Sequence, residues 1–183
     1  VGITEKPSLR FRLDGTFKAK GELVSGEQLV ECVDGCVSWQ GALYSTISFV
    51  PQSKDNTFSL ADVTIGKEFH WERSETQTFG GTLRLIVNRD SLVAINDVPV
   101  EEYLTSVISS EMKSTCPTEY LKASAIVSRS WLLTQMHHRR LGEGKPQPPA
   151  VKRTADSLVR WYDRQEHTLF DVCADDHCQR YQG

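Results

Sequence analysis

One stretch decides the fold class: residues 82–112, which read TLRLIVNRDSLVAINDVPVEEYLTSVISSEM. Its first half predicts a β-hairpin with strands over residues 82–87 and 92–96, because the Asn and Asp side chains between them can bond their own backbone in a turn. Pro99 then begins a helical segment, and the acidic residues that follow it suit the positive end of a helix dipole. Strands followed by helices predict an α+β fold.

Upstream of this stretch, the chain has the composition of short strands. Residues 8–96 are rich in Thr, Val, Phe and Tyr and are interrupted by turn signals such as Asp14–Gly15 and Gly80–Gly81. This pattern predicts antiparallel strands. We therefore divide the chain into a β-rich N-terminal region, residues 1–80, and a second region, residues 81–183, that carries the helices and a Cys/His tail.

Downstream, a second helix is predicted from about Pro117 to Arg140, since proline is well placed in the first turn of a helix. The apolar spacing on one face of this segment predicts an amphipathic helix, and that face carries Tyr120, Ala123, Val127 and Trp131. Residues 142–149 are rich in glycine and proline, so we expect a mobile loop there.

Charge and hydropathy exclude two classes of protein. The 183 residues hold 21 Lys and Arg against 24 Asp and Glu, which gives a net charge of −3. A non-specific nucleic-acid binder needs a broad basic surface, so we expect no nucleic-acid partner. No apolar run reaches the roughly 18 residues of a membrane span. The chain begins with Val rather than Met, which a removed signal peptide or a trimmed start would equally explain.

The five cysteines are unevenly placed, and an odd number cannot all pair within one chain. Cys32 and Cys36 flank a turn, where they could form a small disulfide or remain two unpaired thiols. Near the end, Cys173 and Cys178 lie in a segment that also contains histidines and aspartates. Two thiolates and an imidazole suit Zn²⁺ better than they suit Mg²⁺ or Ca²⁺. A disulfide between Cys173 and Cys178 is the alternative.

Several motifs of the second region, in this order, resemble the stage II sporulation protein D family: residues 94–104, 107–112, 121–131 and 170–183. Members of that family are cell-envelope proteins that act on peptidoglycan. Some are lytic transglycosylases that cut glycan strands, and the related amidase enhancers modulate a partner hydrolase. The resemblance implies an extracytoplasmic protein, in the periplasm or cell envelope, whose partners are peptidoglycan glycan strands and a cell-wall amidase.

Two departures from the family pattern stand out. Ser124 occupies a position where the family usually has glutamine. The family also continues with further strands after the segment that ends here at Gly183, so we expect the domain to be truncated at its C-terminal end.

The resemblance identifies Glu111 as the catalytic acid. From the residues alone, its place in the break between two helices predicts partial burial, which would help the carboxyl hold a proton near neutral pH. A helix cap or a surface ion pair is the alternative. Ordinary glycosidases need two carboxylates. A lytic transglycosylase needs one, because the 6-hydroxyl of the muramic acid itself attacks the anomeric carbon.

The resemblance extends to four more residues. Arg129 matches an arginine of the family's helix, which implies a role in holding Glu111 or the substrate. Some family members carry zinc on one histidine and two cysteines of the tail, which implies His167, Cys173 and Cys178 as ligands here. Water, His177 or a residue beyond Gly183 could take the fourth position.

Together these features predict a peptidoglycan lytic transglycosylase with Glu111 as acid and then base, and with a bound Zn²⁺. A non-catalytic, glycan-binding enhancer of a cell-wall amidase is the second hypothesis. A zinc-stabilised structural domain of a larger envelope assembly is the third.

Overall fold

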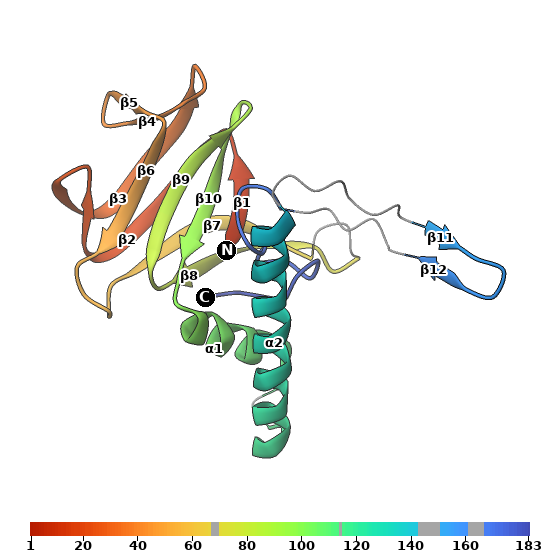
Figure 1. Ribbon diagram of the computed structural model, residues 1–183. Helices are drawn as coiled ribbons and strands as arrows, with labels where there is room; N and C mark the ends of the chain where they lie inside the picture. The colour runs from red at the N-terminus through yellow and green to blue at the C-terminus, as the bar shows by residue number, and fades with distance from the viewer. Residues whose placement is uncertain (67–69, 114, 143–150, 161–166) are drawn as a thin grey trace.

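The computed structural model describes residues 1–66, 70–113, 115–142, 151–160 and 167–183. Within these ranges, ten antiparallel strands precede two helices, a small hairpin and the Cys/His tail (Figure 1). The α+β fold class is confirmed, with the β-rich part first and the helices after it.

The strands of the sheet are β1 (Gly2–Lys6), β2 (Ser8–Ala19), β3 (Glu22–Val33), β4 (Cys36–Trp39), β5 (Ala42–Tyr44), β6 (Thr46–Pro51), β7 (Thr57–Ile65), β8 (Arg73–Phe79), β9 (Thr82–Asn88) and β10 (Ser91–Asp97). Their order across the sheet is β1-β10-β9-β6-β2-β3-β4-β5, and β7 pairs with both β2 and β8. Strand β4 also contacts β9, although three strands separate the two in this order. The sheet therefore curls around its own core.

Strand β2 shows how the sequence builds this sheet. It buries Leu9, Phe11 and Leu13 and exposes Arg10 and Arg12, because successive side chains of a strand point to opposite faces.

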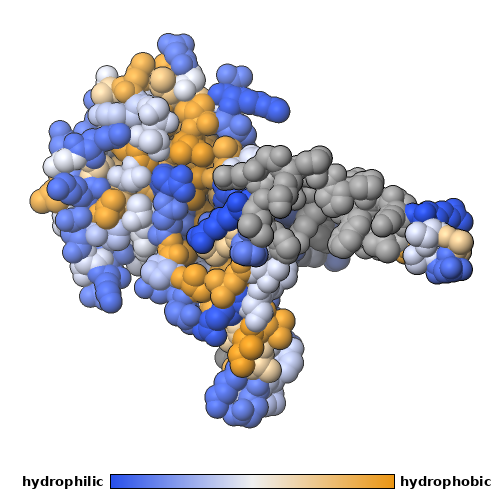
Figure 2. Space-filling view, in the orientation of Figure 1, coloured by the Kyte–Doolittle hydropathy of each residue, from blue (hydrophilic) through white to orange (hydrophobic). Residues whose placement is uncertain are grey.

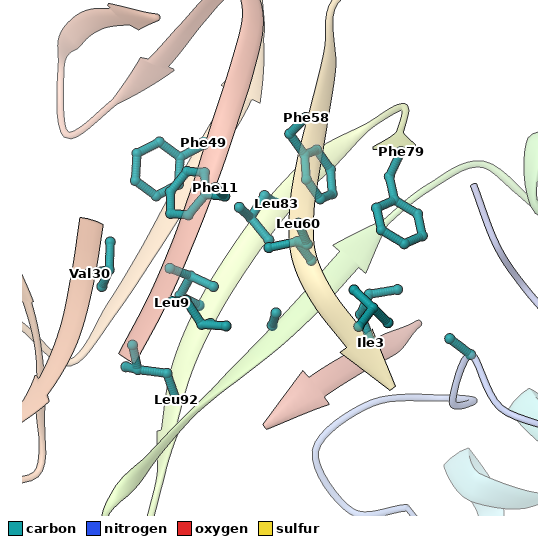
Figure 3. Close-up of a cluster of buried hydrophobic side chains, with 14 of the residues drawn as sticks. Ile3, Leu9, Phe11, Val30, Phe49, Phe58, Leu60, Phe79, Leu83 and Leu92 are labelled. Carbon is teal, nitrogen blue, oxygen red and sulfur yellow. The ribbon is translucent and has the colours of Figure 1, made fainter. Parts of the chain in front are cut away.

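The buried side chains form one hydrophobic cluster. Figure 3 shows phenylalanines from four different strands in it, and the ring centroids of Phe11 and Phe49 lie 4.9 Å apart. The cluster extends from Ile3 in β1 to Tyr181 in the tail. Residues on both sides of the predicted boundary at residue 80 thus share one core.

The predicted hairpin is confirmed as β9 and β10, in which Leu92 pairs with Val87. Arg89 lies in the turn with a φ of +54°, the left-handed conformation that tight hairpin turns require.

Both predicted helices are confirmed, as α1 (Val100–Glu111) and α2 (Thr118–Gly142). Helix α1 buries Tyr103, Leu104 and Val107.

The apolar stripe predicted on α2 packs only in part. Trp131 packs against the core, whereas Tyr120 and Val127 are 51% and 68% exposed. Leu132 and Ser128 are buried instead. Figure 1 shows the reason: one end of α2 extends past α1 and the sheet, and Figure 2 shows apolar surface on that end.

After α2, a two-stranded hairpin consists of β11 (Val151–Arg153) and β12 (Leu158–Arg160). The loop predicted at residues 142–149 falls almost wholly on residues 143–150, which lie outside the described ranges. In the described part of the chain, neither helix combines the length and the apolar composition needed to cross a membrane.

Candidate metal and carboxylate site

The tail that begins at His167 joins the edge of the sheet at β1. Cys173 forms a parallel bridge with Gly2, whose N–H donates to the carbonyl of Val172 at 2.8 Å and whose carbonyl accepts from Ala174 N–H at 2.9 Å. A Cβ at Gly2 would lie only 2.4 Å from the Phe170 ring. A side chain at this position would therefore clash with the Phe170 ring unless that ring moved.

Tyr181 anchors the end of the tail in the core. Its ring stacks on Tyr103 and on Phe79, with centroid separations of 5.2 and 5.7 Å. Its hydroxyl donates to Asn96 Oδ1 at 2.5 Å, and the Asn96 amide nitrogen donates to the carbonyl of Gly80 at 2.8 Å. Burial raises the pKa of Tyr181, so the hydroxyl keeps the proton that it donates.

Four potential metal ligands converge in this tail: His167, Cys173, His177 and Cys178. Their ligand atoms all lie within 4.8 Å of one another. Cys178 Sγ is 3.4 Å from His167 Nε2 and 3.5 Å from His177 Nδ1, and Cys173 Sγ is 3.9 Å from His177 Nδ1. Tetrahedral Zn²⁺ with ordinary bond lengths holds its ligand atoms about 3.4–3.8 Å apart. The cluster could therefore hold a metal ion, and its donor set suits Zn²⁺.

The electrostatics of the cluster favour a metal-binding form of Cys173. Its pKa is lowered to about 3, first by a hydrogen bond from the Cys178 side chain and further by one from His167, although burial acts in the opposite direction. The thiolate is the form of cysteine that binds metals.

Aspartates hold the loop between the two cysteines. The carbonyl of Asp175 accepts from Cys178 N–H at 3.0 Å, and its Oδ1 accepts from Asp176 N–H at 2.9 Å. Arg180 donates to Asp176 Oδ1 from Nε at 3.2 Å and from Nη2 at 3.0 Å. These contacts fix the shape of the loop that carries His177 and Cys178.

The structure brings the three sequence-predicted ligands together and adds His177. Sequence reasoning left His177 as one of three options for the fourth position. The only sequence signal for His177 was its position directly before Cys178. That signal is weak, because adjacent side chains usually point apart. Here the turn closed by Asp175 and Cys178 directs both side chains to one point.

No disulfide joins any of the five cysteines, all of which lie within the described ranges. Cys32 and Cys36 flank the turn between β3 and β4 as unpaired thiols, and Cys173 and Cys178 belong to the group of four potential metal ligands. Neither pair therefore forms the disulfide that was one of its two alternatives.

Glu111 is the last residue of α1, and its side chain is exposed. The expectation of partial burial was wrong, because the last turn of α1 extends past the core. Glu111 lies on the same helix face as Val107, but the core that buries Val107 does not reach Glu111. Its Oε1 accepts a hydrogen bond from Arg180 N–H at 3.1 Å. In the part of the chain that the structure describes, Glu111 belongs to no ion pair.

Arg129 lies elsewhere. Its guanidinium in α2 pairs with Glu101 in the first turn of α1, with Nε 3.1 Å from Oε1 and a second contact between Nη2 and Oε2. Glu101 lies about 15 Å along the helix from Glu111 at 1.5 Å per residue. The structure thus brings Glu111 to the tail that carries the four potential ligands and leaves Arg129 at the other end of α1. A role of Arg129 in the site stays a prediction.

Comparison with known protein families gives a match to the second half of the chain. A family model described as Stage II sporulation protein (SpoIID) matches residues 88–183, which is just over half of the chain. The matched range contains β10, both helices and the complete ligand tail. No curated protein and no solved structure matches this chain.

Proposed function

The chain belongs to the stage II sporulation protein D family, which is linked to cell-wall processing, and we propose that it cleaves peptidoglycan glycan strands as a lytic transglycosylase.

The state of Glu111 carries this proposal. Its carboxylate is exposed, one of its oxygens is oriented by the N–H of Arg180, and it belongs to no ion pair within the described ranges. Two other carboxylates differ, since Asp176 is paired with Arg180 and Glu101, at the other end of α1, is paired with Arg129. A single carboxyl group that is oriented and is held in no ion pair is available for a reaction that needs one acid/base group.

The reaction needs no second protein carboxylate. Glu111 as general acid protonates the glycosidic oxygen, and the bond between that oxygen and the anomeric carbon of muramic acid breaks. Glu111 as base then accepts the proton of the muramic acid 6-hydroxyl, while the oxygen of that hydroxyl bonds to the anomeric carbon. The products are a 1,6-anhydro end and a free 4-hydroxyl. No water is consumed, and Glu111 regains its proton.

The metal has a separate part in this proposal. Zn²⁺ would be held by His167, Cys173, His177 and Cys178, and a site filled by four protein ligands stabilises structure and leaves no open position for substrate. The metal would therefore act by stabilising the conformation of the tail that carries Arg180. We place the protein outside the cytoplasm, where peptidoglycan lies.

One observation favours the alternative function, a non-catalytic enhancer of a cell-wall amidase. Helix α2 exposes Tyr120, Ile126 and Val127 by 51%, 61% and 68%, and exposed apolar groups of this kind often mark contacts with another protein. An enhancer needs such a contact, whereas glycan cleavage does not.

The deciding experiment incubates the protein with glycan strands that lack stem peptides and searches for anhydro-muramyl products by mass spectrometry. We expect products from the wild type and from Glu119→Gln, an exposed helix glutamate that pairs with Lys122. In Glu111→Gln we expect cleavage to fall by about 10²–10⁴-fold, because the amide keeps the shape of the carboxyl group but has no acidic proton to donate. Full cleavage by a folded Glu111→Gln protein removes this residue from the mechanism. A wild type that makes no product but accelerates an amidase supports the enhancer.

A further inference from the structure

The segment after the metal ligands lies along helix α1 and bonds to it repeatedly. The bonds join the tail to three side chains spread along the helix: Tyr103 Oη donates to Gln179 Oε1 at 3.2 Å, Gln182 N–H donates to Ser106 Oγ at 3.2 Å, and Arg180 N–H donates to Glu111 Oε1 at 3.1 Å. The tail is therefore held against α1 by the exposed Glu111 as well as by the buried Tyr103 and Ser106.

Arg180 is bound to the ligand loop in two ways. Its backbone follows Cys178 by two residues, so any shift of that ligand moves the Arg180 amide. Its guanidinium pairs with Asp176, which lies between the ligands Cys173 and His177, and its Cζ lies 4.9 Å from the centre of the Trp71 ring. Both the main chain and the side chain of Arg180 thus depend on the loop that the metal would close.

We propose that metal binding and the orientation of Glu111 are coupled through Arg180, which acts as a positioning residue. Closure of the ligand loop around Zn²⁺ holds the Arg180 N–H against Glu111 Oε1 and so fixes the direction of the exposed carboxylate. This inference rests on the proposed metal site, but it does not require that Glu111 performs catalysis.

Coupling of this kind is reciprocal. If the bound metal stabilises the contact between Arg180 and Glu111, then that contact must stabilise the bound metal by the same factor. Loss of the carboxylate should therefore weaken zinc binding, although Glu111 is not among the ligands. A glutamate with no part in the coupling would leave zinc affinity unchanged.

The first test measures the zinc dissociation constant by competition with a chromogenic chelator. We expect Glu111→Ala to weaken zinc binding by about fivefold, the low end of common coupling factors. Glu111→Gln should bind zinc nearly as the wild type does, because its amide oxygen still accepts from the Arg180 N–H. This variant also separates hydrogen bonding from charge, since both substitutions remove the same negative charge. Glu119→Ala is the matched control and should bind zinc as the wild type does.

The second test follows amide hydrogen exchange by NMR in the zinc-loaded protein. In the wild type, we expect the amides of Arg180 and Gln182 to be protected, and removal of zinc should accelerate exchange at Arg180. In zinc-loaded Glu111→Ala, Arg180 should lose protection while Gln182, which bonds to Ser106, keeps it.

Equal zinc affinities in the wild type and in Glu111→Ala would overturn the coupling. Equal weakening in Glu111→Ala and Glu111→Gln would also overturn it, because the effect would then be one of charge. A wild type that binds no zinc overturns the metal site and this inference with it. None of these measurements uses glycan cleavage, so their failure is distinct from failure of the proposed reaction.

Discussion

Replacing Tyr181 with phenylalanine tests how the tail is held on the fold. The phenylalanine ring keeps the stacking on Tyr103 and Phe79, so the change removes only the hydroxyl that donates to Asn96 Oδ1. Asn96 is 0% exposed, and among the described residues only Tyr181 donates to its Oδ1, while its amide nitrogen donates to the carbonyls of Gly80 and Thr82. The substitution therefore leaves a buried oxygen unsatisfied.

A buried acceptor without a donor lowers stability by about 1–3 kcal/mol, and we expect about 2 kcal/mol here. For a chain of this length each kcal/mol corresponds to about 2–4 °C, so the midpoint of thermal unfolding should fall by about 4–8 °C. Circular dichroism melts of the zinc-loaded protein would measure it, with urea unfolding as a second estimate of the free energy.

Tyr120→Phe is the matched control for this prediction. It removes the same hydroxyl from a residue that is 51% exposed, so the free energy of unfolding should change by less than about 0.5 kcal/mol. If Tyr181→Phe also changes stability by less than about 0.5 kcal/mol, the hydrogen bond to Asn96 does not hold the tail, and the reasoning fails.

Four further predictions concern the site and the core. Purified protein should contain close to one zinc per chain, and a chelator should lower its melting temperature because metal binding is coupled to folding; protein without zinc, in which mass spectrometry finds a Cys173–Cys178 disulfide, would contradict this. In metal-free protein, the rate at which iodoacetamide alkylates Cys173 should stay nearly constant between about pH 5 and 7, because its pKa is lowered to about 3 and the thiolate persists throughout, whereas the rate for an ordinary thiol with a pKa of about 8.5 rises about tenfold per pH unit in that range; a rate for Cys173 that rises about tenfold per pH unit would refute the shift. Arg129→Ala should change the free energy of unfolding by less than about 1 kcal/mol, since its pair with Glu101 is exposed; a large fall in glycan cleavage at unchanged stability would assign it a role in the site, and unchanged cleavage would remove it. Gln77→Met should raise stability by about 1–3 kcal/mol, because both polar atoms of this buried amide lack partners among the described residues; a loss of stability would show that the amide is hydrogen-bonded in solution.

Much of the fold could be predicted because its signals are local. The hairpin of β9 and β10 depends on a turn between two apolar runs, and α1 and α2 depend on proline, acidic first turns and apolar spacing. Each of these patterns lies within one short segment of the chain. The same holds for the metal cluster, since His167, Cys173 and Cys178 lie within one short stretch of the tail.

Burial could not be predicted in the same way, because it depends on where other elements end. Glu111 occupies a helix face that is buried one turn earlier at Val107, but the core stops before the helix does. Val127 has the spacing of a packing residue, yet no described element covers that end of α2, and it is 68% exposed. A periodic pattern states which residues share a face and does not state what lies opposite that face.

The contacts of the site were decided by tertiary structure alone. The sequence by itself determined the α+β order of elements, the ligand types in the tail and the position of Glu111 at the end of a helix. Only the folded chain decided that Arg129 pairs with Glu101, that His177 joins the ligands and that Arg180 donates to Glu111 across 69 positions of sequence. The physical reason is that a hydrogen bond from a backbone N–H leaves no trace in residue type, because every residue except proline carries the same donor.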